Sequence, residues 1–390
     1  MLGCLWKSLC FILSSGASRF LSTSMFREKS GILERHPKSQ SMKINIRQFS
    51  QEELSQSLKE HGQQAFRAKQ IYQWLWQHGV GSFEEMTNLS KDLRQWLEDN
   101  FVIPQIVQDT AQYSTDGTIK VRFKLHDGHL VESVLIPVSK DDRYTLCVST
   151  QVGCSLSCAF CATGKMKMER NLTPGEIIDQ LVLVNRICEE KYNHEITNIV
   201  YMGMGEPMLN YKNVIKSIEI ISSEQGRNMS PRRLTISTAG IAKMIKRLAD
   251  DSPRVNLALS LHAADDFKRS QIMPINEKNN LEVLMEALDY YARIGKGNIT
   301  FEYIMFKHLN DTIEDANNLI ALCRGFRVKV NIIEYNPIGD GVFAKVDSEK
   351  VDRFASHLTQ KGVLVTVRRS RGGDIDAACG QLANKPDKND

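Results

Sequence analysis

Three cysteines with the spacing C-x3-C-x2-C lie near the middle of the chain: Cys154, Cys158 and Cys161. Three thiolates on one short loop suit an iron–sulfur cluster, and a 4Fe-4S cluster has four irons to ligate. Three local ligands leave one iron open, and an open metal position can take a substrate, as a catalytic zinc site takes water. The spacing therefore favours a catalytic cluster over a plain electron carrier.

Zinc is the alternative occupant of these thiolates, because three cysteines and a distant histidine would make a closed structural site. Structural zinc motifs usually contain paired C-x2-C units, whereas only one such short pair occurs in this stretch. A disulfide framework does not suit clustered thiols in a chain of 390 residues, and the nine cysteines indicate a reducing compartment.

A glycine-rich turn and several single polar residues are further candidates for chemistry. Residues 203–207 read Gly-Met-Gly-Glu-Pro, in which glycines let the backbone approach a ligand and Glu206 can pair with an ammonium group. A tight turn with a solvated glutamate is an equally good interpretation. The turn is not a dinucleotide fingerprint, because the G-x-G-x-x-G spacing is absent. Taken alone, the remaining polar candidates are weak: Ser237, Ser260, His262 and Asn336.

Strand-like and helix-like segments alternate from about residue 145 onward, and they must position these residues. Thr173, Pro174 and Glu176 mark a helix start with a capping box. Alternation at this pitch predicts βα units and a parallel sheet, so the fold class is α/β, a partial (β/α)6 TIM-like barrel. The candidate residues follow strand ends, where β/α barrels carry function. The predicted strands are 145–150, 196–202, 233–238, 255–259, 299–305, 328–334 and 363–368.

The rest of the chain divides by composition. Residues 42–105 have apolar residues at helical spacing and a capping box from Ser50 to Glu53, which predicts a small helical accessory domain. Residues 106–140 alternate with period two around Asp-Gly turns, which predicts a β-hairpin extension. The barrel core is expected over 141–382 and a disordered tail over 383–390. Residues 1–41 resemble a transit segment or the product of an upstream start, and we expect them to be disordered.

Charge is balanced over the folded body. Six Lys/Arg and two Asp/Glu fall in the first 41 residues, which leaves 44 of each sign from Met42 onward. A nucleic-acid surface must therefore be a local patch. No apolar run approaches the ~20 residues that span a bilayer, so we expect no membrane partner and a cytoplasmic protein, with organellar targeting by residues 1–41 as the alternative. Candidate patches, each equally a solvated face, are Lys165/Lys167/Arg170, Arg227/Arg232/Arg233 and Arg368/Arg369/Arg371.

The combined motifs resemble the RlmN-type RNA methyltransferases among the radical S-adenosylmethionine (SAM) enzymes. The resemblance runs from about Met42 to Leu382. It implies a radical SAM barrel, and an enzyme that methylates carbon 2 of adenine in 23S rRNA and in tRNA, at the adenine next to the anticodon. The motifs that carry it are Cys154–Cys161 with Phe160, Met202–Pro207, Ser260–Ala263, Tyr335–Pro337 and Arg371–Leu382.

The resemblance also implies cofactors and site residues. Cys154, Cys158 and Cys161 would hold one 4Fe-4S cluster, and SAM, used twice per turnover, would bind the open iron. An external electron donor would be needed, and we expect a monomer that binds rRNA and tRNA. The positions that match SAM contacts of the family are Gly205, Glu206, Ser237, Ser260, Leu261, His262 and Asn336.

Three further residues acquire roles only through the resemblance. Cys379 would be methylated and carry the methyl carbon to the adenine. Glu132 would remove a proton from the resulting protein–RNA adduct. Cys147 would then form a transient disulfide with Cys379 and release the product, which suits a reducing compartment.

Two alternatives remain open at this point. Enzymes that methylate carbon 8 of adenine share all these cysteines, and the helical N-terminal domain favours carbon 2. A protein of another class, a non-catalytic iron–sulfur or zinc protein that binds RNA, would cleave no SAM.

Overall fold

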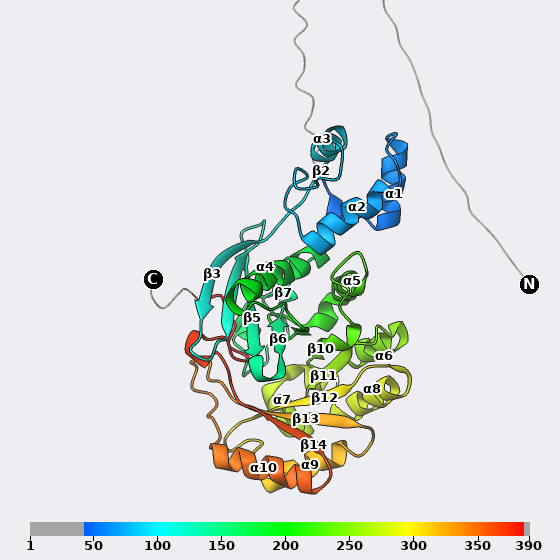
Figure 1. Ribbon diagram of the computed structural model, residues 1–390. Helices are drawn as coiled ribbons and strands as arrows, with labels where there is room; N and C mark the ends of the chain where they lie inside the picture. The colour runs from blue at the N-terminus through cyan, green and yellow to red at the C-terminus, as the bar shows by residue number, and fades with distance from the viewer. Residues whose placement is uncertain (1–42, 386–390) are drawn as a thin grey trace, which may run out of the picture. The chain divides into compact units, whose positions relative to one another are not determined.

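The computed structural model describes residues 43–385 and begins with a helical part (Figure 1). Ser50 accepts a hydrogen bond from the Glu53 amide while the Glu53 side chain binds the Ser50 amide, so the predicted capping box is confirmed. Ile71, Leu75 and Trp76 are buried in the core that these helices share. The elements are β1 (Ile44–Asn45), α1 (Gln51–Glu60), α2 (Arg67–Gln73), a π-helical turn (Trp74–His78), α3 (Lys91–Asn100) and β2 (Phe101–Val102).

A ten-stranded sheet forms the rest of the described chain. Three antiparallel strands come first and pair onto β6: β3 (Val107–Tyr113), β4 (Ile119–Lys124) and β5 (Leu130–Val138). The other seven strands are parallel to one another, in the order of the chain: β6 (Arg143–Cys147), β9 (Asn198–Tyr201), β10 (Leu234–Thr238), β11 (Asn256–Ser260), β12 (Ile299–Met305), β13 (Val328–Glu334) and β14 (Leu364–Arg368).

Helices make the six connections between successive parallel strands, so the predicted α/β fold with a parallel sheet is confirmed. The Thr173 capping box is also present at the start of α4. β14 is the last strand of the sheet and pairs only with β13, so within the described residues the barrel stays open along that edge. The connecting helices are α4 (Pro174–Tyr192), α5 (Tyr211–Ser222), α6 (Ala242–Asp251), α7 (Asp266–Ile272), α8 (Leu281–Ile294), α9 (Ile313–Leu322) and α10 (Ser348–Gln360).

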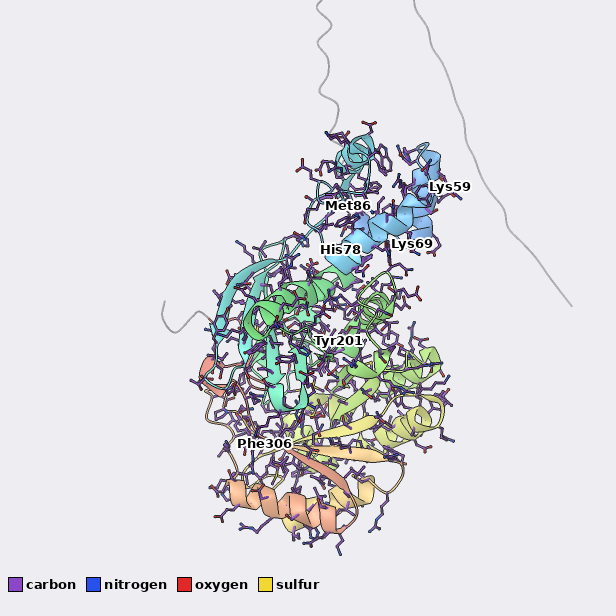
Figure 2. The ribbon with its side chains drawn as sticks, viewed as in Figure 1. Lys59, Lys69, His78, Met86, Tyr201 and Phe306 are labelled. Atoms are coloured by element: carbon purple, nitrogen blue, oxygen red, sulfur yellow. The ribbon has the colours of Figure 1, made fainter. Side chains whose placement is uncertain are left out.

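Burial along the strands follows the pattern expected for a sheet covered by helices. The side chains of Ile236, Leu257, Phe301 and Val330, on four adjacent strands, are fully buried. Tyr201 and Phe306, at the ends of β9 and β12, lie within the barrel body in Figure 2. The packed core fixes the strand ends on which the polar candidates lie.

The ends of the chain differ from expectation in one respect. Residues 383–385, expected to belong to a disordered tail, are held against β5, where Ala383 and Asn384 donate backbone hydrogen bonds to the Glu132 carboxylate. The expected extension over residues 1–41 and the tail over 386–390 lie outside the described residues. No helix in the described range is long and apolar enough to cross a membrane.

One buried ion pair ties the helical part to the barrel. Arg47 Nη1 lies 2.8 Å from both carboxylate oxygens of Asp179 on α4, and it also donates to the Pro104 carbonyl. Both side chains are almost fully buried. Burial raises the pKa of Asp179, and Arg47 opposes that rise by favouring the charged carboxylate.

We expect Arg47→Met to lower the free energy of unfolding by about 3–5 kcal/mol, because it leaves a buried carboxylate without a cation. The loss should be larger at pH 7.5 than at pH 5, since the raised pKa lets the folded state take up a proton as pH falls. Urea denaturation at the two pH values measures both. Lys43→Met, which removes an exposed ion pair with Glu98, is the control and should cost about 0–1 kcal/mol. Equal losses in the two variants would contradict the role of Arg47.

Candidate active site

The cysteine loop follows β6 and is braced from both sides. A short antiparallel pair, β7 (Gln151–Val152) with β8 (Arg170–Asn171), closes its base. Gly153 has φ +75°, and a Cβ there would lie 2.0 Å from the Lys167 carbonyl, so the turn requires glycine. At its far end the Ala162 amide donates to the Gly380 carbonyl at 2.7 Å.

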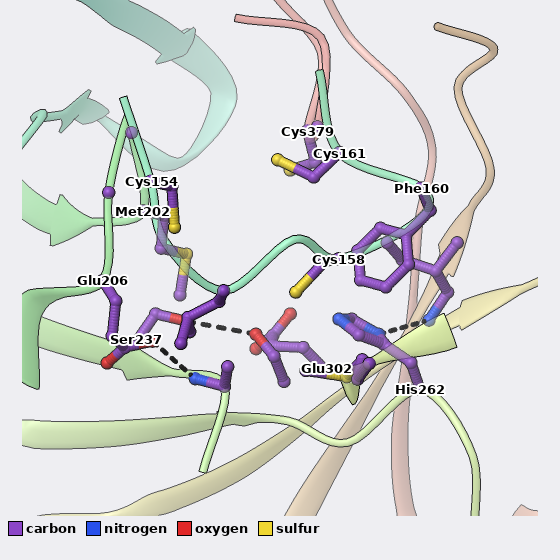
Figure 3. A pocket seen from close by; sticks show the side chains of 18 of the residues that line it. Cys154, Cys158, Phe160, Cys161, Met202, Glu206, Ser237, His262, Glu302 and Cys379 are labelled. Atoms are coloured by element: carbon purple, nitrogen blue, oxygen red, sulfur yellow. Dashed lines mark hydrogen bonds between the residues drawn. The ribbon is translucent and has the colours of Figure 1, made fainter. Parts of the chain in front are cut away.

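The three cysteines of the loop line one cavity, and Figure 3 shows the sulfurs of Cys154 and Cys158 directed into it. Burial raises the pKa of Cys154 to about 11 and also raises those of Cys158 and Cys161. The free thiols are therefore protonated near neutral pH, and a metal that binds them must displace their protons.

The glycine-rich turn after β9 forms another wall of this cavity. The Met204 carbonyl accepts hydrogen bonds from the amides of Thr150 and Gln151, and the Glu206 amide donates to Gln151 Oε1 at 2.8 Å. Gly203 lies so close to the chain after β6 that a Cβ would be 2.7 Å from the Val148 carbonyl. The turn and the cysteine loop therefore form one rigid unit.

The Glu206 carboxylate is buried at the cavity wall. It accepts hydrogen bonds from the Ala239 amide at 2.8 Å and the Met208 amide at 3.0 Å. Burial raises the pKa of Glu206 to about 7, and these hydrogen bonds partly offset that rise. A carboxylate in this position can pair with a cationic group of a ligand.

Three more predicted residues line the same cavity: Ser237, Ser260 and His262. The two serine hydroxyls lie 3.5 Å apart at the ends of β10 and β11. His262 has φ +56°, and its Nδ1 accepts a hydrogen bond from the Ile304 amide at 3.1 Å. Burial lowers the pKa of His262 to about 3, so the imidazole is neutral and carries its proton on Nε2.

Leu261 and Asn336 lie elsewhere. Leu261 is fully buried in the core beside the cavity and does not line it. Asn336 lines a second cavity, and its Nδ2 donates to the Cys379 carbonyl at 3.5 Å. The tertiary structure thus places Asn336 beside the C-terminal cysteine loop.

The second cavity adjoins the first and contains the two remaining cysteines. Cys147 and Cys379 both line it, and Cys379 also lines the first cavity (Figure 3). Cys147 is buried, and burial together with the neighbouring Cys379 raises its pKa to about 12. Cys379 is exposed. The side chain of Cys379 therefore stands on the wall shared by the two cavities.

Two more charged residues line the site. Sequence reasoning missed Glu302, and it named Arg368 only as part of a candidate basic patch. Glu302 on β12 is buried, lines the first cavity, and accepts a hydrogen bond from Asn331 Nδ2 at 2.7 Å. Arg368 at the end of β14 lies 3.3 Å from Glu302 and lines both cavities. In the sequence, a single charged residue in a strand looks like a solvent-facing position. The one signal for Glu302 was its place inside a predicted parallel strand, where most residues are buried.

Glu132 lies outside the linings of both cavities. Its carboxylate, 1% exposed, lies 3.4 Å from Lys120 Nζ and accepts the amides of Ala383 and Asn384. In this arrangement both carboxylate oxygens have protein partners. The assignment of Glu132 as a base stays a prediction, and it requires the chain at 383–384 to move away.

The arginines before Cys379 also have protein partners. Arg369 pairs with Glu334 and Asp352, and Arg371 binds the Pro137 carbonyl and the Asp116 carbonyl. These contacts anchor the loop. Of the other predicted patches, Lys165 pairs with Asp340, and Arg170 pairs with Glu176 and Asp127.

The first cavity suits an iron–sulfur cluster by the chemistry of its donors. Within residues 43–385 no three Cys, His, Asp or Glu side chains converge closely enough to hold a single metal ion. A 4Fe-4S cluster is larger, and its thiolates bind different irons around it. Three thiols of one loop lining one cavity fit that group, with a carboxylate and two hydroxyls on the opposite wall for a polar ligand.

Comparisons with known proteins cover nearly all of the described chain. A family model of the ribosomal RNA large subunit methyltransferase N-terminal domain matches residues 44–103, and one of the radical SAM superfamily matches residues 148–320. The probable dual-specificity RNA methyltransferase RlmN of Cytophaga hutchinsonii is 55% identical over 340 residues, 87% of this chain and 93% of that protein. The dual-specificity RNA methyltransferase RlmN of a Nitratiruptor strain is 44% identical, covering 87% of this chain and 98% of that protein.

A solved structure agrees with the sequence comparisons. The crystal structure of a radical SAM methyltransferase from Sphaerobacter thermophilus matches with a TM-score of 0.83 and 38% identity, covering 88% of this chain and all of that one.

We expect Lys120→Met to lower the free energy of unfolding by about 3–5 kcal/mol, because it leaves the buried Glu132 carboxylate without the cation that pairs with it. Lys124→Met, on the exposed end of the same strand, is the control and should change stability by less than about 0.5 kcal/mol. Urea denaturation measures both. A Lys120→Met protein as stable as the control would show that this ion pair does not hold Glu132 in place.

Proposed function

Because this chain belongs to the RlmN family of radical SAM RNA methyltransferases, we propose that it methylates carbon 2 of adenine in ribosomal and transfer RNA through Cys379. Its cofactors are a 4Fe-4S cluster and SAM, as for the radical SAM superfamily. The methylated atom and the catalytic residues are the parts that we propose for this chain.

The position of Cys379 between the two cavities is the observation that carries this proposal. Carbon 2 of adenine is not nucleophilic, so a methyl group cannot pass to it directly from SAM. Cys379 faces the cluster cavity on one side and the second cavity on the other. It can therefore receive a methyl group in the cluster cavity and present it to the adenine in the second cavity. The exposed side chain of Cys379 meets both requirements.

The residues of the first cavity divide between two tasks. Cys154, Cys158 and Cys161 would hold the cluster, and Glu206 would pair with the amino group of SAM. Bound SAM supplies the methyl group and, when cleaved reductively, the radical that activates it. The neutral His262 packs edge-on against Phe160, with the two ring centroids 4.7 Å apart, so this part of the cavity wall beside the cysteines is uncharged.

Cys147 is placed to release the product. It lines the second cavity with Cys379 and can form a disulfide with it. As that S–S bond forms, the bond between Cys379 sulfur and the bridging carbon breaks, and the carbon takes up a proton to become the methyl group on adenine. The disulfide is then reduced for the next cycle. Burial raises the pKa of Cys147 to about 12, which disfavours the thiolate needed for this step. The nearby Arg368 guanidinium favours the thiolate and so assists the step.

We further propose that the enzyme acts as a cytoplasmic monomer and receives electrons from an external donor. Glu132 removes the proton from the protein–RNA adduct once residues 383–384 move away from its carboxylate. Recognition uses a folded RNA from which the target adenine is unstacked.

Anaerobic reconstitution of the cluster, followed by incubation with SAM, a reductant and RNA, tests the proposal. We expect 5′-deoxyadenosine and an adenine methylated at carbon 2, located by mass mapping of RNA fragments. Methylation at carbon 8 would overturn the assigned position. Cluster-loaded protein that makes no 5′-deoxyadenosine would overturn the reaction itself and favour a non-catalytic RNA-binding protein.

The two redox cysteines should give opposite phenotypes. Cys379→Ala should abolish methylation, because no residue carries the methyl carbon. Cys147→Ala should accumulate protein covalently joined to RNA, visible as a shifted band on a denaturing gel. Cys188→Ala, within α4 and outside both cavities, is the control and should turn over normally. Clean turnover by Cys147→Ala would remove that residue from the mechanism.

Glu206→Gln should weaken SAM binding at least about tenfold, since a charge-assisted hydrogen bond contributes roughly 1.5–3 kcal/mol. Equilibrium binding of SAM to cluster-loaded protein measures the change, and the iron content of the variant shows that the cluster itself is retained. Unchanged affinity with full cluster content would exclude Glu206 as the partner of the SAM amino group.

A further inference from the structure

We propose that a groove along the open edge of the barrel binds the sugar-phosphate backbone of the single-stranded RNA next to the target adenine. We name it the β14 groove, and it consists of three adjoining cavities along β14. The inference rests on the proposed function, because it starts from the cavity that contains Cys379 and Cys147.

The three cavities adjoin one another, because neighbouring cavities share lining residues. The cavity of Cys379 and Cys147 shares Arg143 and Arg368 with a larger cavity inside the lower barrel. That larger cavity shares Arg327 and Leu364 with a third cavity at the start of β13 and β14. The three cavities therefore lie one after another along β14, from the reacting cysteines to the opposite end of the sheet.

The charged side chains that line the upper part of the β14 groove are all arginines. They are Arg143, Arg368, Arg369 and Arg371, and no Asp or Glu of the described chain lines this cavity. Each of the four pairs with a carboxylate outside the lining: Asp141, Glu302, Glu334 with Asp352, and Asp116, respectively. The uncompensated positive charge of the groove therefore comes from its lower part.

The lower part of the groove has an excess of positive charge. Five more cations line it: Arg293, Arg324, Arg327, Lys329 and Lys361. Its two carboxylates are already paired, Asp289 with Arg293 and Glu302 with Arg368. The lower groove is therefore positively charged overall, which favours an anionic ligand.

Four of these cations have no protein partner. Within residues 43–385 the side chains of Arg324, Arg327, Lys329 and Lys361 make no hydrogen bond or ion pair, and all four are exposed. Arg324 and Arg327 lie in the connection before β13, Lys329 lies in β13 itself, and Lys361 lies in the connection before β14. Lysines and arginines held together without counter-charges repel one another, and phosphates would relieve that repulsion.

Single-stranded RNA fits this groove for two reasons. An adenine that enters the cavity of Cys379 must leave its stack, so the nucleotides beside it are unpaired where they meet the protein. Proteins that bind single strands without reading sequence use a positively charged groove that follows the backbone. β14 adds an unpaired strand edge, whose free amide groups can also donate to phosphate oxygens.

The salt dependence of RNA binding tests the β14 groove. The observed binding constant of a single strand falls with salt by a slope of about −0.7 per phosphate contacted. The double variant Arg327→Ala/Lys329→Ala should therefore reduce the slope of log K against log salt by about 1.4, with the RNA held constant. It should raise KM for RNA and leave kcat unchanged, because neither residue touches the reacting atoms.

The matched control is Lys212→Ala/Lys243→Ala, which removes two exposed lysines from α5 and α6 on the outside of the barrel. Its slope should equal that of the unaltered protein. An unchanged slope in the groove variant, or an equal decrease in the control, would overturn the groove. Failure of the unaltered protein to methylate RNA would instead overturn the proposed function, so the two results are distinguishable.

A charge-reversed variant, Arg327→Glu/Lys329→Glu, gives a second measurement. It should reduce the slope further and bind a long single-stranded substrate more weakly than the alanine variant does. Far-ultraviolet circular dichroism and SAM cleavage without RNA show whether it is folded. Binding as tight as in the unaltered protein would exclude phosphate contacts at these positions.

Discussion

The hydrogen bonds between the segments that follow β6 and β9 are the constraint on which the rest of the site depends. The Met204 carbonyl accepts the amides of Thr150 and Gln151, and the Met204 amide donates to Ser149 Oγ at 2.9 Å. These bonds join the cysteine loop to the glycine-rich turn before any ligand is bound. Because the two segments leave adjacent parallel strands, the bonds set the position of the three thiols relative to Glu206.

The C-terminal loop completes the site by docking on this unit. The Gly380 carbonyl accepts the Ala162 amide, and Thr163 Oγ1 donates to the Leu382 carbonyl at 2.6 Å. These contacts hold Cys379 beside a loop about 220 residues earlier in the chain. The open edge at β14 is what leaves room for a second cavity on the other side of Cys379. A closed barrel would fill that space with side chains.

Charge is distributed so that most ions near the site have partners, whereas Arg324, Arg327, Lys329 and Lys361 in the lower β14 groove have none within residues 43–385. Arg369 and Arg371 anchor the C-terminal loop, and Lys120 compensates the buried Glu132. The unpaired cations lie farther along the groove, where water screens them. An RNA backbone placed there would gain electrostatic attraction without competing with the contacts that hold the reacting cysteines.

Three features were predictable from the sequence alone: a cluster-binding loop at the cysteine triplet, a tight glycine-rich turn and a parallel sheet. Each of them depends on local spacing or periodicity. The strand ends were predicted to within a few residues, and 299–305 and 328–334 agree with β12 and β13. Only the tertiary structure decided that Cys379 faces two cavities, that Glu302 and Arg368 join the site, and that Glu132 is held by residues 383–384. The physical reason is distance along the chain: these contacts join segments up to about 250 residues apart, and their energy depends on burial and on partners that no local pattern records.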